Sequence, residues 1–303
     1  MNDEDIVRYF VQTVREDGNM SEAVAAIQTL VEYMKLNTAE TLSGLRDNLK
    51  HAIEIVSNTE VRQTAILSGC ELFLRFITLA SLDSPDFQEC RQVLIERGNM
   101  FLKKCRFCRR KIAKLGLPFI RDGATILTHS YSRVVLQLLK DAMEANRRFR
   151  VFVTQSAPDN AGNRLHDELT KLGVPSTLIL DSAVGYVMEK VDMVLVGAEA
   201  VVESGGIINK IGTYTMAISA REMHKPVYVL AESFKFARIY PLNQQDVPDQ
   251  FKYPSNVLTG QVDLNSEHPL VDYTPPAYLS LLVTDLGVLT PSAVSDELIK
   301  LYC

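Results

Sequence analysis

The stretch Val191-Asp-Met-Val-Leu-Val-Gly-Ala-Glu-Ala-Val-Val-Glu-Ser-Gly-Gly-Ile-Ile-Asn-Lys-Ile-Gly-Thr-Tyr-Thr-Met216 decides the fold. Its apolar run Met193–Val196 is typical of a strand buried on both faces of a parallel sheet. Glu199 stands just past the end of this strand. The chain then breaks at two glycines and enters an amphipathic run over 214–223, preceded by Asn209, Lys210, Gly212 and Thr213. Such a helix entrance is typical of an anion site. The alternative is an ordinary strand–loop–helix unit with a solvated lysine.

Short apolar runs of the same kind recur after residue 118. They predict six strands: Ala124–Leu127, Val151–Val153, Thr177–Leu180, Met193–Val196, Val227–Leu230 and Leu279–Val283. Helix-length segments separate the first five, over 132–146, 162–172, 183–190 and 212–223. This alternation predicts right-handed crossovers and a parallel, helix-covered sheet with the Rossmann-like strand order 3-2-1-4-5-6. No Gly-x-Gly-x-x-Gly follows the first strand, which argues against a dehydrogenase.

The first 120 residues have a helical pattern instead. Ser21 is a plausible N-cap for a helix ending at Leu36, Thr41 lies at another helix start, and two further helices are predicted over 70–82 and 87–117. We therefore predict an α/β chain with a helical N-terminal domain over 1–120 and a Rossmann-like domain over 121–303.

A long insertion at about 233–277 interrupts the second domain. It is rich in proline and contains no long periodic run. Its apolar side chains would be costly to expose, so we expect packing against a partner: Phe234, Phe236, Ile239, Tyr240 and Phe251. The last helix should begin near Pro291, because proline suits a first helical turn.

Composition narrows the function classes. The net charge is −5, which argues against direct nucleic-acid binding, and the basic run between residues 97 and 114 is interpreted as a solvated face. No apolar run is long enough to span a membrane, and the acidic N-terminus does not resemble a signal peptide. Five sparse cysteines indicate a reduced, cytoplasmic protein, and Cys105-Arg-Phe-Cys108 lacks the companions of a zinc or redox site.

Polar side chains follow the first and fourth predicted strands, which are adjacent where the winding of the sheet reverses. Ligands of open parallel sheets bind at the carboxyl ends of strands at this place. We expect one pocket to contain His129, Ser130, Tyr131, Arg133, Glu199, Asn209, Lys210, Gly212 and Thr213. A hydrolase triad of His129, Ser130 and Glu199 is disfavoured, because no Gly-x-Ser-x-Gly elbow is present. The histidines lack metal-ligand spacing, so we expect a binding pocket with no catalytic residues, metal or cofactor.

Four segments carry a resemblance to a known family: Ile126-Leu-Thr-His-Ser-Tyr-Ser132, Val196-Gly-Ala-Glu199, Gly205-Gly-Ile-Ile-Asn-Lys-Ile-Gly-Thr213 and Leu286-Gly-Val-Leu-Thr-Pro-Ser-Ala-Val-Ser-Asp-Glu-Leu298. The chain resembles, over essentially its whole length, the alpha-type regulatory subunits of translation initiation factor 2B. The last segment favours alpha over beta or delta. The wider superfamily includes methylthioribose-1-phosphate isomerase and ribose-1,5-bisphosphate isomerase.

The resemblance implies a C-terminal domain that pairs with a second copy and a complex that includes beta and delta subunits. It implies a role in exchanging GDP for GTP on initiation factor 2, with inhibition when that factor's alpha subunit is phosphorylated. The exchange chemistry belongs to another subunit in this family. We expect the helical domain to contact the phosphorylated client through exposed positions such as Thr41, Arg46 and Glu71.

Departures from the isomerases bear on catalysis. They carry Cys where this chain has Ser130 and Asp where it has Glu199, and their Arg-Gly-Ala-Pro-Ala-Ile phosphate loop corresponds to Glu22–Ile27, without the Arg. A hydroxyl is a far weaker acid than a thiol, and Glu is one methylene longer than Asp, so the proton-transfer pair is lost. We expect the pocket to be either a sensor or an evolutionary vestige that keeps the groups needed to bind a sugar phosphate or a nucleotide. The alternative is an active sugar-phosphate isomerase.

Overall fold

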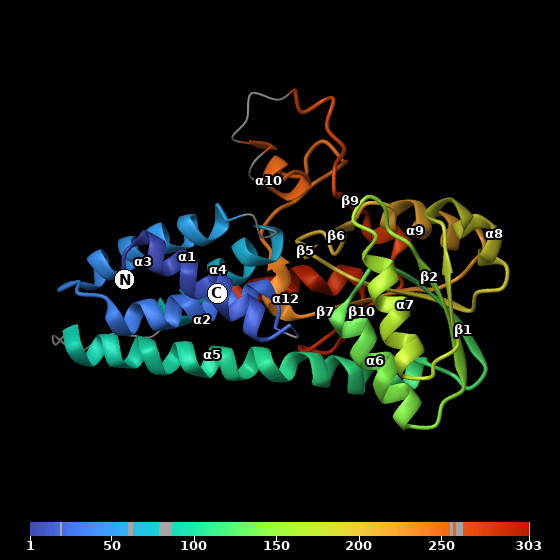
Figure 1. Cartoon of the computed structure of the whole chain (residues 1–303), viewed down its shortest axis with the longest axis horizontal. Coiled ribbons are helices and arrows are strands. Elements are labelled where there is room, and N and C mark those ends of the chain that lie inside the picture. Colours follow the sequence, from blue (N-terminus) through green and yellow to red (C-terminus); the bar gives the residue numbers. More distant parts are fainter. Residues whose placement is uncertain (19, 60–62, 79–86, 255–256, 259–262, 303) are drawn as a thin grey trace. The chain divides into compact units, whose positions relative to one another are not determined.

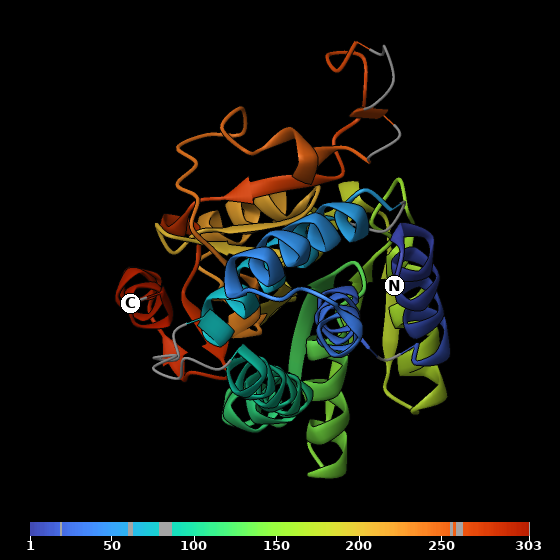
Figure 2. The same ribbon diagram turned by 90° about the vertical axis from the view of Figure 1, so that its left-hand side faces the viewer.

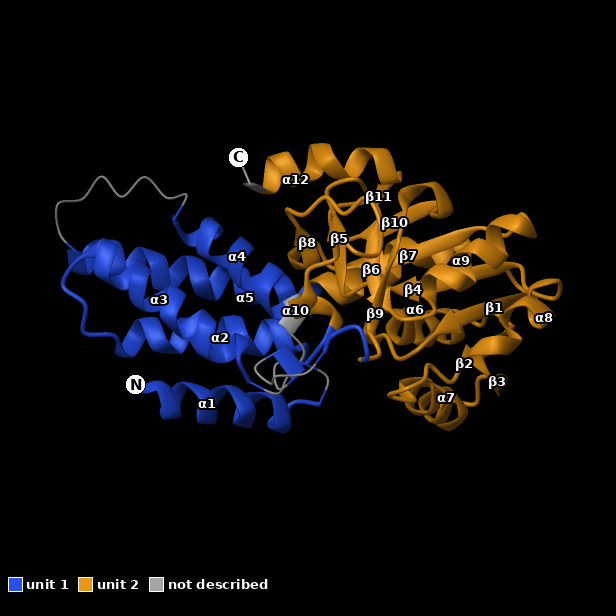
Figure 3. Ribbon diagram, turned by 90° about the horizontal axis from the view of Figure 1, so that it is seen from above, with its two compact units in different colours: residues 1–107, 253–266, 302 blue, residues 108–252, 267–301, 303 orange. Residues whose placement is uncertain are grey.

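The computed structural model describes residues 1–18, 20–59, 63–78, 87–254, 257–258 and 263–302. They form two compact units (Figure 3). Residues 1–107 and 253–266 belong to the first unit, and residues 108–252 and 267–301 to the second. The domain boundary expected at residue 120 stays a prediction.

The first unit is built from helices, as predicted. They are α1 (Asp3–Glu16), α2 (Glu22–Leu36), α3 (Leu42–Ser57), α4 (Gln63–Thr78) and most of α5 (Phe87–Gly116). The Ser21 hydroxyl accepts a hydrogen bond from Val24 N, and the Thr41 hydroxyl accepts one from Gly44 N. The predicted N-cap at Ser21 and the predicted helix start at Thr41 are therefore confirmed. The helix end predicted at residue 82 lies outside the described residues.

The basic run of α5 includes side chains with structural contacts. Arg97 donates two hydrogen bonds, of 3.0 and 2.6 Å, to Phe76 O near the C-terminus of α4. The last carbonyls of a helix lack intrahelical partners and carry partial negative charge, so a guanidinium there stabilises the helix. Lys103, Arg106 and Arg110 are exposed as expected. The solvated-face interpretation is therefore wrong for Arg97. Helix α5 is seen side-on in Figure 1 and end-on in Figure 2.

The second unit contains the predicted sheet. Its strands are β1 (Ala124–His129), β2 (Phe149–Thr154), β3 (Ser176–Ile179), β4 (Met193–Gly197), β7 (Val227–Ala231), β10 (Leu281–Thr284) and β11 (Val288–Leu289). The order is β3-β2-β1-β4-β7-β10-β11, with parallel pairs except for the antiparallel β10–β11 edge. All six predicted strands and their 3-2-1-4-5-6 order are confirmed. Every residue of β1 and β4 is buried, which explains the unbroken apolar run Met193–Val196 in β4.

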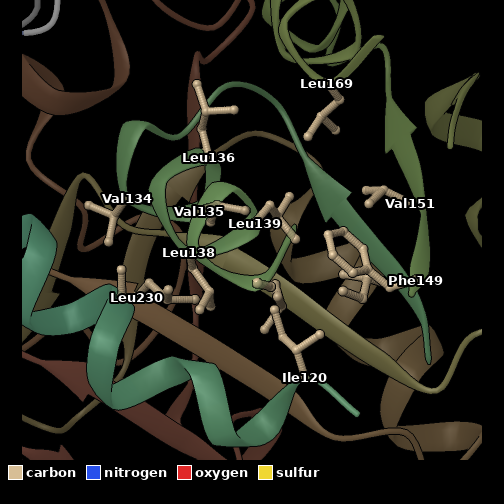
Figure 4. Close-up of a cluster of buried hydrophobic side chains, with 14 of the residues drawn as sticks. Ile120, Val134, Val135, Leu136, Leu138, Leu139, Phe149, Val151, Leu169 and Leu230 are labelled. Atoms are coloured by element: carbon tan, nitrogen blue, oxygen red, sulfur yellow. The ribbon is translucent and has the colours of Figure 1, made fainter. Parts of the chain in front are cut away.

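Helices cover both faces of this sheet, because its winding reverses between β1 and β4 (Figure 1). One face is covered by α6 (Arg133–Glu144) and α7 (Ala161–Lys171), and the other by α8 (Val184–Met188) and α9 (Thr213–Glu222). Figure 4 shows the core on the first face, where Val135 and Leu139 of α6 and Leu169 of α7 meet the sheet. The core fixes both helices against the strands that they connect.

A second sheet was not predicted. It contains β5 (Ala200–Val202), β6 (Ile207–Lys210), β8 (Phe236–Ala237) and β9 (Val271–Thr274), in the order β8-β5-β6-β9. The stretch after Gly197 is therefore a hairpin rather than a loop, and the expected insertion supplies two strands and the short helix α10 (Asp249–Lys252).

The aromatic side chains of the insertion have a different environment from the one expected. Phe234, Phe236 and Phe251 are buried within this chain, so the expected packing on a partner is wrong for these three. Tyr240 is 62% exposed. Pro291 begins a short 3-10 turn that continues into α12 (Val294–Tyr302), as predicted.

Candidate functional site

His129 ends β1 and is fixed from both ring nitrogens. Its Nδ1 lies 2.6 Å from Thr154 Oγ1, and its Nε2 lies 2.8 Å from Ile211 O. Because a carbonyl only accepts hydrogen bonds, Nε2 carries the proton and donates it. Burial lowers the pKa of His129, against the opposing effect of the Ile211 bond and nearby Asp181. The side chain is therefore a neutral structural tie between the two sheets.

Lys210 ends β6 and is paired with an acidic side chain from another loop. Its Nζ lies 2.5 Å from Asp159 Oδ2, and the lysine side chain is only 8% exposed. Asp159 belongs to the loop after β2, and its Oδ1 accepts a hydrogen bond from Ala161 N at the start of α7. The ion pair therefore joins the second sheet to the carboxyl edge of the first.

The loop after β2 is itself held by Asp181, which follows β3. Asp181 Oδ1 accepts a hydrogen bond from Ser156 N, and its Oδ2 accepts one from Ala157 N. The same carboxylate lies 3.8 Å from His129 Nδ1. Asp159 is consequently carried on a fixed loop.

The entrance of α9 is already occupied by a carboxylate of the protein. Asp272 Oδ2, from β9, accepts hydrogen bonds from Gly212 N at 2.7 Å and Tyr214 N at 3.0 Å. Burial raises the pKa of Asp272 to about 7, although the two N–H groups oppose this change. The expectation that these backbone groups are open to an external anion is therefore corrected.

Thr213 and Asn209 are also engaged locally. The Thr213 hydroxyl donates to Lys210 O at 2.6 Å and accepts from Asn209 Nδ2 at 3.0 Å. Gly212 has a φ of +102°, and a Cβ at this position would lie 3.1 Å from the His129 ring. Glycine at 212 therefore permits both the left-handed backbone and the close approach to the imidazole. These residues fix the backbone that presents Lys210.

Ser130 occupies the position where the resemblance implies a thiol in the isomerases. It has a φ of +62° and is 2% exposed, and its Oγ has no hydrogen-bond partner within the described residues. A buried hydroxyl in this state lacks any base to activate it, so the geometry gives no nucleophile.

Tyr131, Arg133 and Glu199 were also predicted to line the pocket, and they follow the ends of β1 and β4. The Tyr131 ring faces the guanidinium of Arg164, 4.2 Å from the ring centroid, while Arg133 begins α6 and Glu199 forms the turn between β4 and β5. A Cβ at Gly197 would lie 2.6 Å from Ser132 Oγ, so the loops after β1 and β4 do approach each other. Ligand contacts by these residues stay predictions.

Three acidic residues of the site were missed from the sequence. Asp159 and Asp181 follow β2 and β3, so the strand-end rule that selected His129 would have found them if applied to every strand. Asp272 lies in a strand within the expected loop and had no such signal. The structure thus brings together five of the predicted residues: His129, Asn209, Lys210, Gly212 and Thr213. Their charged groups and hydrogen-bond donors are, however, largely paired with other groups of this chain.

A cavity of about 530 Å³ lies at the opposite edge of the first sheet, beside the amino ends of β1, β4 and β7. Phe119 and Tyr228 line it, with ring centroids 5.1 Å apart. In the described part of the chain, no cluster of three or more His, Cys, Asp or Glu residues is arranged to hold a metal ion. Cys105 and Cys108 are both buried. None of the described helices meets the length and apolarity needed to cross a membrane.

The model of the initiation factor 2 subunit family matches residues 15–291 of the chain. The chain belongs to this family. Within the initiation factor 2 subunit family, a Caenorhabditis elegans protein named translation initiation factor eIF2B subunit alpha is 44% identical, with all of both chains covered. A Dictyostelium discoideum protein of the same name is also 44% identical, covering 98% of this chain and 97% of its own. The predicted resemblance to alpha-type subunits is therefore confirmed.

More distant relatives of the chain are named as enzymes. A ribose 1,5-bisphosphate isomerase of Archaeoglobus fulgidus is 29% identical, covering 93% of this chain and 88% of its own. The names of the two relatives with higher identity are those of translation-factor subunits, in agreement with the prediction that this chain is not an enzyme.

Solved structures support the fold. A Pyrococcus horikoshii protein described as translation initiation factor eIF-2B matches with a TM-score of 0.75 and 28% identity, covering 95% of this chain and 98% of its own. A chain of the tetrameric eIF2B-beta2-delta2 complex from C. thermophilum matches with a TM-score of 0.78, covering 99% and 96%. At 20% identity, the second match is evidence of the fold alone.

Proposed function

We propose that the chain is the alpha regulatory subunit of the guanine-nucleotide exchange factor for translation initiation factor 2, without catalysis of its own. The observation that carries the proposal is the 44% identity to eIF2B alpha subunits along the full length of both chains. The buried Ser130 hydroxyl supports the absence of isomerase chemistry, because a thiol-based proton transfer has no counterpart there.

We further propose that the second unit forms a homodimer and that the assembly includes beta and delta subunits. Light scattering on the purified chain should give twice the mass of 33.9 kDa at micromolar concentration. Affinity purification from a lysate of the source cells should recover the beta and delta subunits with the tagged chain. A strict monomer that recovers neither subunit would contradict the proposal.

The pocket around Lys210 is proposed to sense a sugar phosphate or a nucleotide rather than to convert one. Thermal unfolding with each class of ligand is the direct test, because a ligand at about 100 times its dissociation constant adds roughly 2.7 kcal/mol of stability. Turnover of ribose 1,5-bisphosphate or methylthioribose 1-phosphate by the pure chain would instead support the isomerase alternative, which the archaeal relatives make worth testing.

A further inference from the structure

We propose that the outer face of helix α5 docks an acidic amphipathic helix of another protein. We call this surface the α5 face. It consists of exposed apolar and basic side chains on the side of α5 that points away from α2 and α4: Val93, Met100, Lys103, Phe107, Arg110 and Lys111. The inference does not rest on the Lys210 pocket. It also concerns a helix other than α3 and α4, where Arg46 and Glu71 are expected to contact the client.

Close contacts with α2 fix the rotation of α5 about its own axis. A Cβ at Gly98 would lie only 2.8 Å from Val31 Cγ2, so glycine lets the two helices approach closely. The guanidinium of Arg91 donates hydrogen bonds to Met34 O at 3.0 Å and to Lys35 O at 2.7 Å, at the end of α2. The other helices of the first unit lie on one side of α5 (Figure 1). Its opposite side is therefore a defined outer surface of this unit.

Three apolar side chains form a line along this outer surface. Val93, Met100 and Phe107 are 40%, 51% and 54% exposed, whereas the residue that follows each of them is buried. A single exposed apolar residue is common, but a repeat of seven residues is the spacing by which one helix meets another. The repeat corresponds to about 10.5 Å along α5. An extended strand presents a side chain on one face about every 6.7 Å and does not match it. The spacing therefore favours a helical partner.

The charges beside this line select an acidic partner. The chain has a net charge of −5, yet no acidic residue occurs between 97 and 114. Lys103, Arg110 and Lys111 are exposed. Within the described ranges, no carboxylate forms an ion pair with any of these three cations. Charged groups at the rim of an apolar contact steer a partner of opposite charge and disfavour others. Carboxylates on both sides of an apolar stripe complement this arrangement.

Nucleic acid and anionic membranes fit the α5 face less well. Phosphate groups offer no counterpart to the apolar line. Glu96 is exposed, and it lies seven residues before Lys103, so its carboxylate would repel a phosphate backbone on the same side of the helix. A helix that lies in a membrane interface needs a broad apolar face, and here one exposed apolar residue is present per two turns. A protein helix satisfies both the apolar and the charged groups.

Fluorescence anisotropy of labelled synthetic peptides with the full chain tests the proposal. The probe is a helical peptide of about three heptads, with leucines along one face and glutamates on both sides of them. One control peptide has the same composition with the leucines dispersed around the helix, and another has lysines in place of the glutamates. We expect the wild-type chain to bind the probe about tenfold or more tightly than either control peptide.

Two pairs of variants locate the binding on α5. Phe107→Ser removes an apolar contact and Lys111→Glu reverses a charge, so each should weaken binding of the probe about tenfold. The matched controls are Leu36→Ser, at a position as exposed as Phe107, and Lys50→Glu, at an exposed position on α3. Both controls should bind the probe as wild type does. Thermal melting followed by circular dichroism checks that each variant is folded, and if one α5 variant unfolds the other still decides.

Several results would overturn the inference. They are no binding of the probe by wild type, equal binding of the ordered and dispersed peptides, and binding that both α5 variants leave unchanged. Phosphatidylserine vesicles and single-stranded RNA provide the remaining comparison. If either binds more tightly than the probe and is lost in Lys111→Glu but kept in Phe107→Ser, the face serves a phosphate-bearing partner and the inference is wrong.

Discussion

Buried carboxylates in the second unit differ in whether a cation accompanies them. Glu232 lies 3.1 Å from Lys235 Nζ and 3.8 Å from Arg109 Nε. Burial opposes ionisation of Glu232, but the two cations outweigh it and lower the pKa of the carboxyl group. Arg109 is therefore a second member of the basic run with a structural contact. Asp272 is stabilised instead by two backbone N–H groups, which do not offset its burial.

Asp272 should make stability depend on pH. Its pKa is about 7 in the folded chain and near 3.8 when unfolded, so the folded state binds the extra proton and loses stability as pH rises from about 4 to 7. The effect has an upper limit of about 4 kcal/mol. Asp272→Asn should remove this pH dependence. The free energy of unfolding of the variant, measured with urea, should therefore rise relative to that of wild type between pH 5 and pH 8. If the difference in the free energy of unfolding between wild type and Asp272→Asn is the same at pH 5 and pH 8, the raised pKa does not belong to Asp272.

Lys210 should carry much of the affinity for an anionic ligand. Replacing it by Met removes a charge-assisted hydrogen bond, and we expect sugar-phosphate binding to weaken by about 1.5–3 kcal/mol with folding largely kept. Calorimetric titration of both proteins measures the change. Lys171→Met provides the matched control for loss of a lysine. Equal affinity in wild type and Lys210→Met would move the ligand away from this edge of the sheet.

At the scale of elements, α7 depends on one close backbone approach. A Cβ at Gly162 would lie 1.8 Å from Thr154 O, a distance that no small adjustment relieves. Gly162→Ala should therefore displace α7 from β2 and destabilise the fold by several kcal/mol, roughly the range of severe core changes. Gly185→Ala in α8 is the control, since a Cβ there meets nothing within 4 Å. The control should be neutral or stabilising by up to about 1 kcal/mol. Denaturant midpoints of the two variants give the comparison.

The strands of the two sheets differ in how well they can be predicted from the sequence. The strands β1, β4 and β7 are buried on both faces or nearly so, and each leaves an apolar run between turn residues. The strands of the second sheet are two to four residues long. β6 pairs with β9 across about 60 residues of chain, for example Asn209 with Asp272. No local period marks such strands, so their pairing follows from tertiary packing.

The same difference applies to the site. His129 and Lys210 were predicted because each stands beside a recognisable strand or helix. The acidic partners of these side chains, Asp181 beside His129 and Asp159 beside Lys210, come from loops distant in sequence. Charge complementarity of this kind depends on three-dimensional distances, and a single sequence does not contain them.

At the scale of the whole molecule, we expect the helical unit to bind the phosphorylated alpha subunit of initiation factor 2. Thr41, Arg46 and Glu71 are all exposed, as expected. Charge reversal at Arg46 and Glu71 should release inhibition of nucleotide exchange by phosphorylated initiation factor 2 while leaving the oligomeric state unchanged. Lys103→Glu, at an exposed position on α5, controls for a general effect of charge. Persisting inhibition across a scan of exposed residues in this unit would place the contact elsewhere.

The pairing of β6 with β9 has a consequence for synthesis on the ribosome. The ribosome synthesises His129, Asp159 and Lys210 well before Asp272, whose carboxylate binds the backbone N–H groups at the start of α9. Until β9 has left the exit tunnel, Gly212 N and Tyr214 N lack their acceptor, and the edge of β6 is unpaired. The edge around Lys210 is therefore among the last parts of the second unit to be completed, and a ribosome stalled near residue 250 would carry a second sheet that lacks β9.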